Sequence, residues 1–212
     1  MAGMFSTEPT LVDAEGRLSF AQDLFKARQD KKDDGSIVEK FGCTIIYVLS
    51  ARALLEKILA EAIVGEWGEK GLQRAANGAI KSPFLAGDGK EARNKQTGEL
   101  HPGMGPDVFF IRPWSMFQPA LRYKSEQIPA TAEEIYSGCY GKAALHAFCW
   151  HNPKNGDGVS FGIDFFQKTR DGDRLGNGGG AVDASKFYQK IEDHGEAPSS
   201  TKSGAGAGGL FG

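Results

Sequence analysis

The sequence predicts a mainly β fold with a small amount of helix, and three observations support this prediction. Residues 139–150 alternate between small or apolar side chains and polar or aromatic ones, and residues 159–170 repeat the pattern. A period of two residues is that of a strand with two different faces. Residues 51–67 instead place apolar side chains three and four positions apart, as an amphipathic helix does.

Two predicted strands precede this helix. Residues 17–26 form the first and residues 36–49 the second, in which β-branched side chains favour burial on both faces. Gly42 marks a bulge or bend in the second strand, as at the corner of a barrel. A helix at 51–67 that interrupts a succession of strands is typical of an OB-like β-barrel with a helix over one opening. We therefore predict an OB-like barrel with one helix between its strands.

The middle of the chain combines a long loop with two short strands. Residues 71–105 are rich in glycine and carry several cations. A loop of this length inside a compact domain is usually functional or disordered. Short strands are predicted at 107–112 and 120–124, before the alternating segments begin.

Basic residues in this middle region are candidates for contact with phosphate. The loop contributes Lys81, Lys90, Arg93 and Lys95, which could equally be solvated. Arg112 and Arg122, in the short strands, are candidates of second rank. The rings beside them, Trp114 and Tyr123, could fill the core instead of a binding face.

The chain divides into three predicted parts. Residues 1–16 form a flexible N-terminal arm, and residues 17–194 form the OB-like domain, which ends in a short C-terminal helix starting at Asp183. Residues 195–212 are rich in glycine, serine and alanine. Such a composition buries too little apolar surface to offset the loss of chain entropy, so this tail is predicted to be disordered.

The two alternating segments are predicted to form a hairpin with one apolar face and one face of rings and cations. The residues between them are rich in asparagine, glycine and aspartate, which favour turns. If the apolar faces agree, the opposite face presents Tyr140, Lys142, Phe148, Trp150, Phe166, Lys168 and Arg170. Flat rings beside cations suit unpaired bases, because every base has a π-face and every link has a phosphate. The same rings could instead cover a second hydrophobic layer, such as a packed helix.

Three motifs resemble a family of phage and prophage single-stranded DNA-binding proteins, long catalogued as a domain of unknown function. They are IYSGCY at 135–140, GVSFG at 158–162 and QKTRDGDRLGNGGG at 167–180. Weaker similarity lies in LSFAQDLF (18–25) and FLAGDGKE (84–91). The resemblance covers about residues 17–180. It implies an OB-type barrel that binds single-stranded DNA without base preference, in phage replication or recombination.

The amino-acid composition gives little support to DNA binding, but it does indicate the cellular compartment. The net charge is -2 and the sequence pI is near 6.1, so DNA binding requires cations gathered on one face. The three cysteines, Cys43, Cys139 and Cys149, form no CxxC pair, which favours a reduced cytoplasmic setting. Neither a signal peptide nor an apolar run of about 20 residues is present, so no membrane association is expected.

The sequence predicts neither an enzyme nor a metal or other cofactor. It lacks a cluster of carboxylates with the spacing of a nuclease and the common nucleophile motifs. His146, Cys149 and His151 are close in sequence, but strand alternation separates His146 from the other two. A zinc site there is disfavoured.

The predicted function is therefore sequence-independent binding of single-stranded DNA. The alternative is a structural or interaction module, such as a virion or scaffold component, that uses the same aromatic face to bind protein. Leu210 and Phe211 lie in the Gly/Ser/Ala-rich tail. An apolar group on a loose tether could recruit a replication or recombination protein.

Overall fold

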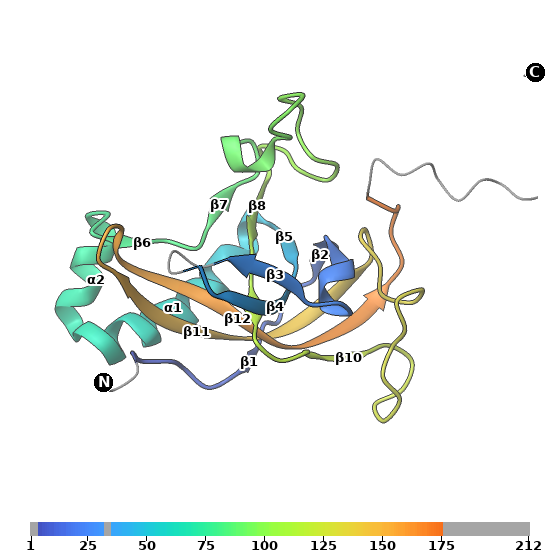
Figure 1. Ribbon diagram of the computed structural model, residues 1–212, viewed down its shortest axis with the longest axis horizontal. Helices are drawn as coiled ribbons and strands as arrows, with labels where there is room; N and C mark the ends of the chain where they lie inside the picture. Colours follow the sequence, from blue (N-terminus) through green and yellow to red (C-terminus); the bar gives the residue numbers. More distant parts are fainter. Residues whose placement is uncertain (1–3, 32–34, 176–212) are drawn as a thin grey trace, which may run out of the picture. The chain divides into compact units, whose positions relative to one another are not determined.

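The computed structural model describes residues 4–31 and 35–175, which form a mainly β structure (Figure 1). The strands are β1 (Thr10–Leu11), β2 (Gly16–Ser19), β3 (Arg28–Lys31), β4 (Ile37–Gly42), β5 (Thr44–Val48), β6 (Ile80–Lys81), β7 (Leu85–Ala86), β8 (Val108–Ile111), β9 (Trp114–Ser115), β10 (Ala120–Arg122), β11 (Tyr140–Asn152) and β12 (Gly156–Arg170). The helices are α1 (Arg52–Trp67) and α2 (Glu69–Ala76), with 3-10 turns η1 (Ala21–Leu24), η2 (Leu49–Ala51) and η3 (Lys90–Ala92).

The strands belong to two sheets. A nine-stranded sheet has the order β10-β12-β11-β2-β5-β8-β7, with β1 added to β11 and β6 to β12, and a three-stranded sheet has the order β3-β4-β9. The mainly β prediction is confirmed. Within the described residues no pairing joins β7 to β10, so a closed OB-like barrel is not confirmed.

The hairpin of β11 and β12 is the longest paired unit, and it matches the two segments chosen from the sequence. Its register runs antiparallel from Tyr140 opposite Arg170 to Asn152 opposite Gly156. Every second residue of β11 from Gly141 to Cys149 is buried, and the residues between them are half-buried. This confirms the period of two. We call the face with the buried residues the inner face and the opposite one the outer face.

The inner face of β11 packs against α1. The buried side of α1 consists of Leu55, Ile58, Leu59, Ala62 and Ile63. The thiol of Cys149 on β11 donates to the carbonyl of Ala62 at 3.4 Å. A second helix, α2, follows after Gly68, so two helices stand where one was predicted. No helix in the described ranges is long and apolar enough to cross a membrane. The predicted helix from Asp183 lies outside the described residues.

The predicted strand 36–49 is two strands that belong to different sheets. The break falls at Cys43, directly after Gly42, which ends β4 and pairs with Trp114. A Cβ atom on Gly42 would lie 2.9 Å from the carbonyl oxygen of Pro113, so glycine permits this approach. The bend predicted at Gly42 is confirmed. It carries β4 out of the nine-stranded sheet and toward β9.

Residues 4–12, predicted to belong to a flexible arm, instead run along β11. The amide of Thr7 donates to Ala147 and the amide of Cys149 donates to Phe5, each at 2.9 Å. Val12 is buried in the core. The physical reason is the edge of β11, which pairs with β2 only at Tyr140 and Gly141 and otherwise leaves its N–H and C=O groups open.

Candidate nucleic-acid interface

The outer face of β11 carries a row of rings, as predicted from the alternation. His146, Phe148 and Trp150 stand there at successive even positions, all half-buried. Trp150 donates from Nε1 to the hydroxyl of Ser160 at 2.9 Å. The His146 Nδ1 atom lies 2.6 Å from a carboxylate oxygen of Asp164. Both rings are therefore fixed by hydrogen bonds to β12.

Two glycines of β12 make room for these rings. A Cβ atom on Gly158 would lie 2.1 Å from the indole of Trp150, and one on Gly162 would lie 2.1 Å from the imidazole of His146. Each ring thus lies directly over the backbone of the neighbouring strand. Glycine inside a strand commonly marks such a close approach.

The small sheet adds a third large ring and a cation. Trp114 of β9 meets Phe148 edge to face, with ring centroids 5.3 Å apart. The ammonium of Lys40, on β4, lies 4.3 Å from the centroid of the Trp114 ring. Trp114, Phe148 and Trp150 form what we call the ring row. It offers half-buried aromatic surface beside a cation, the combination that stacks bases and contacts phosphates.

Phe166 and Lys168 do not lie on the outer face, and their predicted placement is wrong. Phe166 is 0% exposed and Lys168 is 4% exposed. The cause is a bulge: Ala144 pairs with Phe165 but Leu145 pairs with Ile163, which leaves Asp164 as an extra residue. One extra residue reverses the faces of the residues that follow it as far as Lys168. A second register shift, opposite Gly141 and Tyr140, returns Arg170 to the outer face. Phe165 takes the place predicted for Phe166.

Lys168 is held inside the structure by two hydrogen bonds and by contact with aromatic rings. Its ammonium donates to the carbonyl of Glu134 and to the carboxylate of Asp171, both at 2.7 Å. It also lies 4.3 Å from the ring centroid of Tyr123. Burial opposes the charged form, but the hydrogen bond and charge of Asp171 outweigh it and raise the pKa of Lys168. This lysine stabilises the fold.

Tyr140, Lys142 and Arg170 meet at the other end of the outer face, but the two cations are already paired. The guanidinium of Arg170 lies 3.5 Å from the Tyr140 ring centroid and bonds Glu15 at 3.0 Å. Lys142 bonds Asp13 at 2.6 Å. Hydrogen bonds from Thr169 and Arg170 lower the pKa of Glu15. A phosphate here would compete with these carboxylates.

Arg122 lies on β10 in the same row as Lys142. The register of β10 against β12 pairs Arg122 with Gln167, which in turn pairs with Lys142. Its guanidinium donates to the carbonyls of Glu126 at 2.6 Å and Leu121 at 2.9 Å. The hydrogen bonds of Arg122 thus stabilise the loop that follows β10. Along the hairpin, Arg122 and Lys142 lie far from Trp150.

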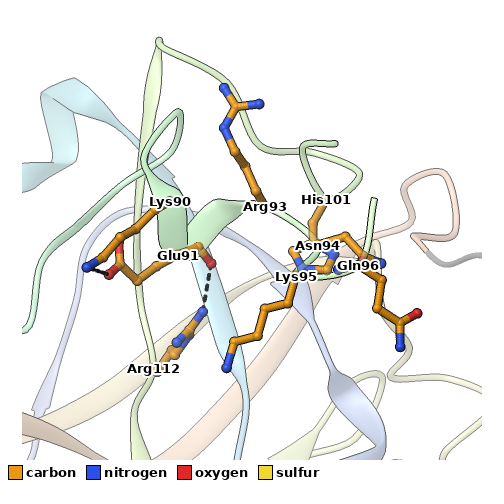
Figure 2. A pocket seen from close by; sticks show the side chains of 8 residues that line it. All are labelled: Lys90, Glu91, Arg93, Asn94, Lys95, Gln96, His101 and Arg112. Carbon is orange, nitrogen blue, oxygen red and sulfur yellow. Dashed lines mark hydrogen bonds and ion pairs between the residues drawn. The ribbon is translucent and has the colours of Figure 1, made fainter. Parts of the chain in front are cut away.

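Arg112 lies in a second basic region, apart from the hairpin. It lines a hollow of about 830 Å³ in the loop that follows β7, and Figure 2 shows the side chains. The lining consists of Lys90, Glu91, Arg93, Asn94, Lys95, Gln96, His101 and Arg112. Arg112 donates to the Glu91 carbonyl at 2.9 Å. Desolvation lowers the pKa of Arg112, and nearby Arg28 adds to this effect.

The residues considered for a zinc site are used elsewhere. His146 bonds Asp164, Cys149 bonds the backbone of α1, and His151 lies 2.8 Å from Asp157. In the described part of the chain, no group of three or more histidine, cysteine or acidic residues could hold a metal ion.

Comparison with known proteins identifies the relatives of this chain. The family model described as Enterobacter phage Enc34, ssDNA-binding protein matches residues 10–197. The chain belongs to this family. The resemblance found in the sequence is confirmed.

One sequence relative and two solved structures are similar to this chain. Protein p50 of Acyrthosiphon pisum secondary endosymbiont phage 1 is 28% identical over 180 residues, which cover 81% of this chain and 88% of p50. The single-stranded DNA-binding protein of bacteriophage Enc34 in complex with ssDNA has a TM-score of 0.51 at 18% identity, covering 77% of this chain and 87% of that one. A C-terminal truncation of the Enc34 protein has a TM-score of 0.52 at 17% identity, covering 76% and 86%. These likenesses show a shared fold.

Two of the three motifs that carry the resemblance, IYSGCY and the segment that contains RDGDR, form a brace within the fold. The Tyr136 hydroxyl donates to Asp171 at 2.7 Å, and Arg17 donates to the Asp173 carbonyl at 2.9 Å. Gly138, at φ 117°, lies so close to Asp173 that a Cβ atom would clash with its backbone. The IYSGCY and RDGDR segments therefore contact each other, and Arg17 links β2 to them. The ring row lies further along the hairpin.

Three residues on or beside the outer face, Trp114, His146 and Lys40, were not predicted as site residues from the sequence. From the sequence, Trp114 is only a neighbour of Arg112, and His146 is only a member of the alternation and of the disfavoured zinc site. Lys40 gave no signal, because its position over Trp114 depends on the pairing of β4 with β9. The one sequence signal for Trp114 is its position in a short run between Pro113 and Pro119, beside Arg112.

Proposed function

We propose that this protein binds single-stranded DNA without base preference, by stacking bases on the ring row and contacting phosphates through nearby cations. The observation that carries the proposal is the cluster of Trp114, Phe148 and Trp150 beside Lys40, on a face fixed by hydrogen bonds. Membership of the Enc34 family supports the same ligand. Rings read no base edges, so stacking tolerates every sequence.

Stacking is expected to contribute more than charge. The chain carries a net charge of -2, so its attraction for DNA is local. Each stacked base contributes about 1–3 kcal/mol. Two of the predicted cations, Lys142 and Arg170, are paired with carboxylates and one, Lys168, is buried. Lys40 beside the ring row is also paired, with Asp30 at 3.2 Å. We therefore assign the phosphate contacts mainly to the basic loop around Arg112.

The test is a fluorescence anisotropy titration with labelled oligonucleotides of equal length. Single strands of two unrelated sequences should bind with similar affinity, and the matching duplex should bind far more weakly. The logarithm of the binding constant should fall with the logarithm of salt concentration, by about 0.7 per phosphate contacted. A chain that binds no single strand at either of two salt concentrations would overturn the proposal.

The alternative, a protein-interaction module, is favoured by exposed apolar side chains next to the ring row. Phe117 is 81% exposed, and Met116 and Ile128 are also exposed. Met116 and Phe117 follow β9 directly, whereas Ile128 follows β10. Exposed apolar side chains of this kind are suited to binding a protein. The same titration separates the two functions, because a pure interaction module would not respond to oligonucleotides.

The setting of this activity belongs to the same proposal. We place it in phage replication or recombination in the host cytoplasm, where the three buried thiols stay reduced. The fold is proposed to be an opened relative of the OB barrel.

Leu210 and Phe211 are proposed to bind a replication or recombination protein. Deletion of residues 203–212 should abolish capture of that partner and leave DNA affinity unchanged, and a several-fold change in affinity would contradict this role.

A further inference from the structure

Phe20 has an unusual backbone conformation for a large side chain. Strand β2 ends at Ser19, earlier than the predicted strand 17–26, and Phe20 turns the chain into η1 with φ 56° and ψ 42°. It is the one non-glycine residue with positive φ in the described ranges. This left-handed region disfavours side chains with a Cβ atom and costs free energy. Such residues cluster at functional sites when the surroundings enforce them.

The surroundings of Phe20 do enforce the turn. The amide of Ala21 donates to the Ser137 hydroxyl at 3.0 Å, and the amide of Gly138 donates to the Leu18 carbonyl at 2.7 Å. Leu18 and Leu24 on either side are fully buried. The brace described above therefore fixes the backbone. The ring of Phe20 itself stays 44% exposed and adds little to the core.

The ring of Phe20 stands at the edge of the basic hollow. It meets the imidazole of His101 edge to face, with ring centroids 5.9 Å apart, and His101 lines the hollow. Figure 2 shows Lys95 and Arg112 extending to the same side of the loop, while Arg93 points away. Within the described ranges Lys95 has no ion-pair or hydrogen-bond partner.

The hollow and the ring row adjoin along the chain. Arg112 lines the hollow and Trp114 belongs to the ring row, with only Pro113 between them. Two residues of extended chain span about 6–7 Å. Arg28 and Lys40 lie opposite each other on β3 and β4, and both pair with Asp30. Lys40 lies over Trp114, and Arg28 is near enough to Arg112 to lower its pKa. A strand of DNA leaving the ring row would thus pass cations before it reaches the hollow.

We propose that Phe20 and His101 form a second stacking subsite for single-stranded DNA. A base stacks on the exposed ring of Phe20, and the adjoining phosphates contact Lys95 and Arg112. This subsite rests on the proposed function, because the ligand is the same strand that occupies the ring row. The left-handed turn is the device that presents the ring to the hollow.

The test uses three substitutions at one position in the full chain. Phe20→Gly removes the ring and relieves the backbone, so the melting temperature should not fall. Its affinity for a long single strand should still drop by at least about fivefold, the value of one lost stack. Phe20→Ala should lose affinity equally, and Phe20→Tyr should retain it. Phe5→Ala is the matched control: Phe5 is 37% exposed but contacts Gly65 on α1, and its loss should leave affinity unchanged.

Photo-crosslinking tests the location directly. A single strand that carries 5-iododeoxyuridine should yield a crosslinked peptide that contains Phe20 or His101. Wild-type affinity in Phe20→Gly and Phe20→Ala would overturn the subsite, as would a loss that Phe20→Tyr fails to restore. These outcomes differ from failure of the proposed function, in which the wild-type chain itself does not bind the strand.

Discussion

At the scale of single residues, the half-buried rings of the outer face are held in place by small neighbours. Trp150 lies over Gly158 and is bonded to Ser160, and His146 lies over Gly162. A ring that is already fixed loses little rotamer freedom when a base stacks on it. More of the stacking free energy is then retained as affinity.

Trp150→Ala and Trp114→Ala are each expected to weaken single-strand binding by about 1–3 kcal/mol, because each removes one stacking surface. Anisotropy titrations measure the affinity, and circular dichroism verifies the fold. Trp67→Ala is the matched control, because Trp67 lies on α1 beside Arg74 and away from the outer face. Equal losses in all three variants would show that destabilisation, not stacking, is responsible.

Two adjacent phenylalanines should differ sharply in their contribution to stability. Phe166→Ala is expected to lower the free energy of unfolding by about 3–5 kcal/mol, because the ring is fully buried. Phe165→Ala removes a half-exposed ring from the outer face and should cost clearly less. Urea denaturation of both variants measures the difference. The reverse order would mean that the strand faces are assigned wrongly.

At the scale of elements, the bulge at Asp164 decides which residues of β12 reach the core. Before it, Val159, Phe161 and Ile163 point inward, and after it Phe166 and Lys168 do. Bulges serve to re-aim side chains and to increase local twist. Here the bulge buries the ammonium group of Lys168, whereas its partner Asp171 stays exposed.

Deletion of Asp164 should destabilise the protein far more than Asp164→Ala. The deletion restores strict alternation, so Phe166 and Lys168 would turn toward solvent and leave the core unfilled. The substitution keeps the residue count and removes only the contact with His146. Thermal unfolding of the two variants separates the effects. A deletion variant as stable as Asp164→Ala would show that the bulge has no role in packing.

At the scale of the whole molecule, several ion pairs tie distant segments together. Asp13 and Glu15 bind Lys142 and Arg170 of the hairpin, and Asp157 binds Arg74 of α2. Lys142 lowers the pKa of Asp13 through a hydrogen bond and its charge. Hydrogen bonds lower the pKa of the other two carboxyl groups, from Thr169 and Arg170 at Glu15 and from His151 and Arg74 at Asp157. They connect the N-terminal segment, the hairpin and the helices.

Stability is expected to fall in acid. A carboxyl group whose pKa is lower in the folded state stabilises the protein above its unfolded pKa, and this contribution is lost as the pH falls through the folded value. The melting temperature should therefore decline below about pH 4. Glu15→Gln should flatten this decline, as measured by calorimetry across a pH series. Parallel profiles for the variant and wild type would exclude a contribution from Glu15.

The features that could be predicted before the structure are those that depend on local periodicity and on short motifs. The alternation in 139–150 placed Phe148 and Trp150 on one face, Gly42 marked a real bend, and the IYSGCY motif indicated the family. The remaining features depend on contacts between segments that are distant in the sequence, and they appear only in the folded structure. The extra residue at Asp164 is invisible until β12 is paired with β11, and it moved Phe166 and Lys168 into the core. Trp114 joins the ring row, and Phe20 reaches the basic hollow, through neighbours far away in sequence. The periodicity of one segment carries no information about such neighbours. Strand register is a property of two paired strands, and neither strand alone specifies it.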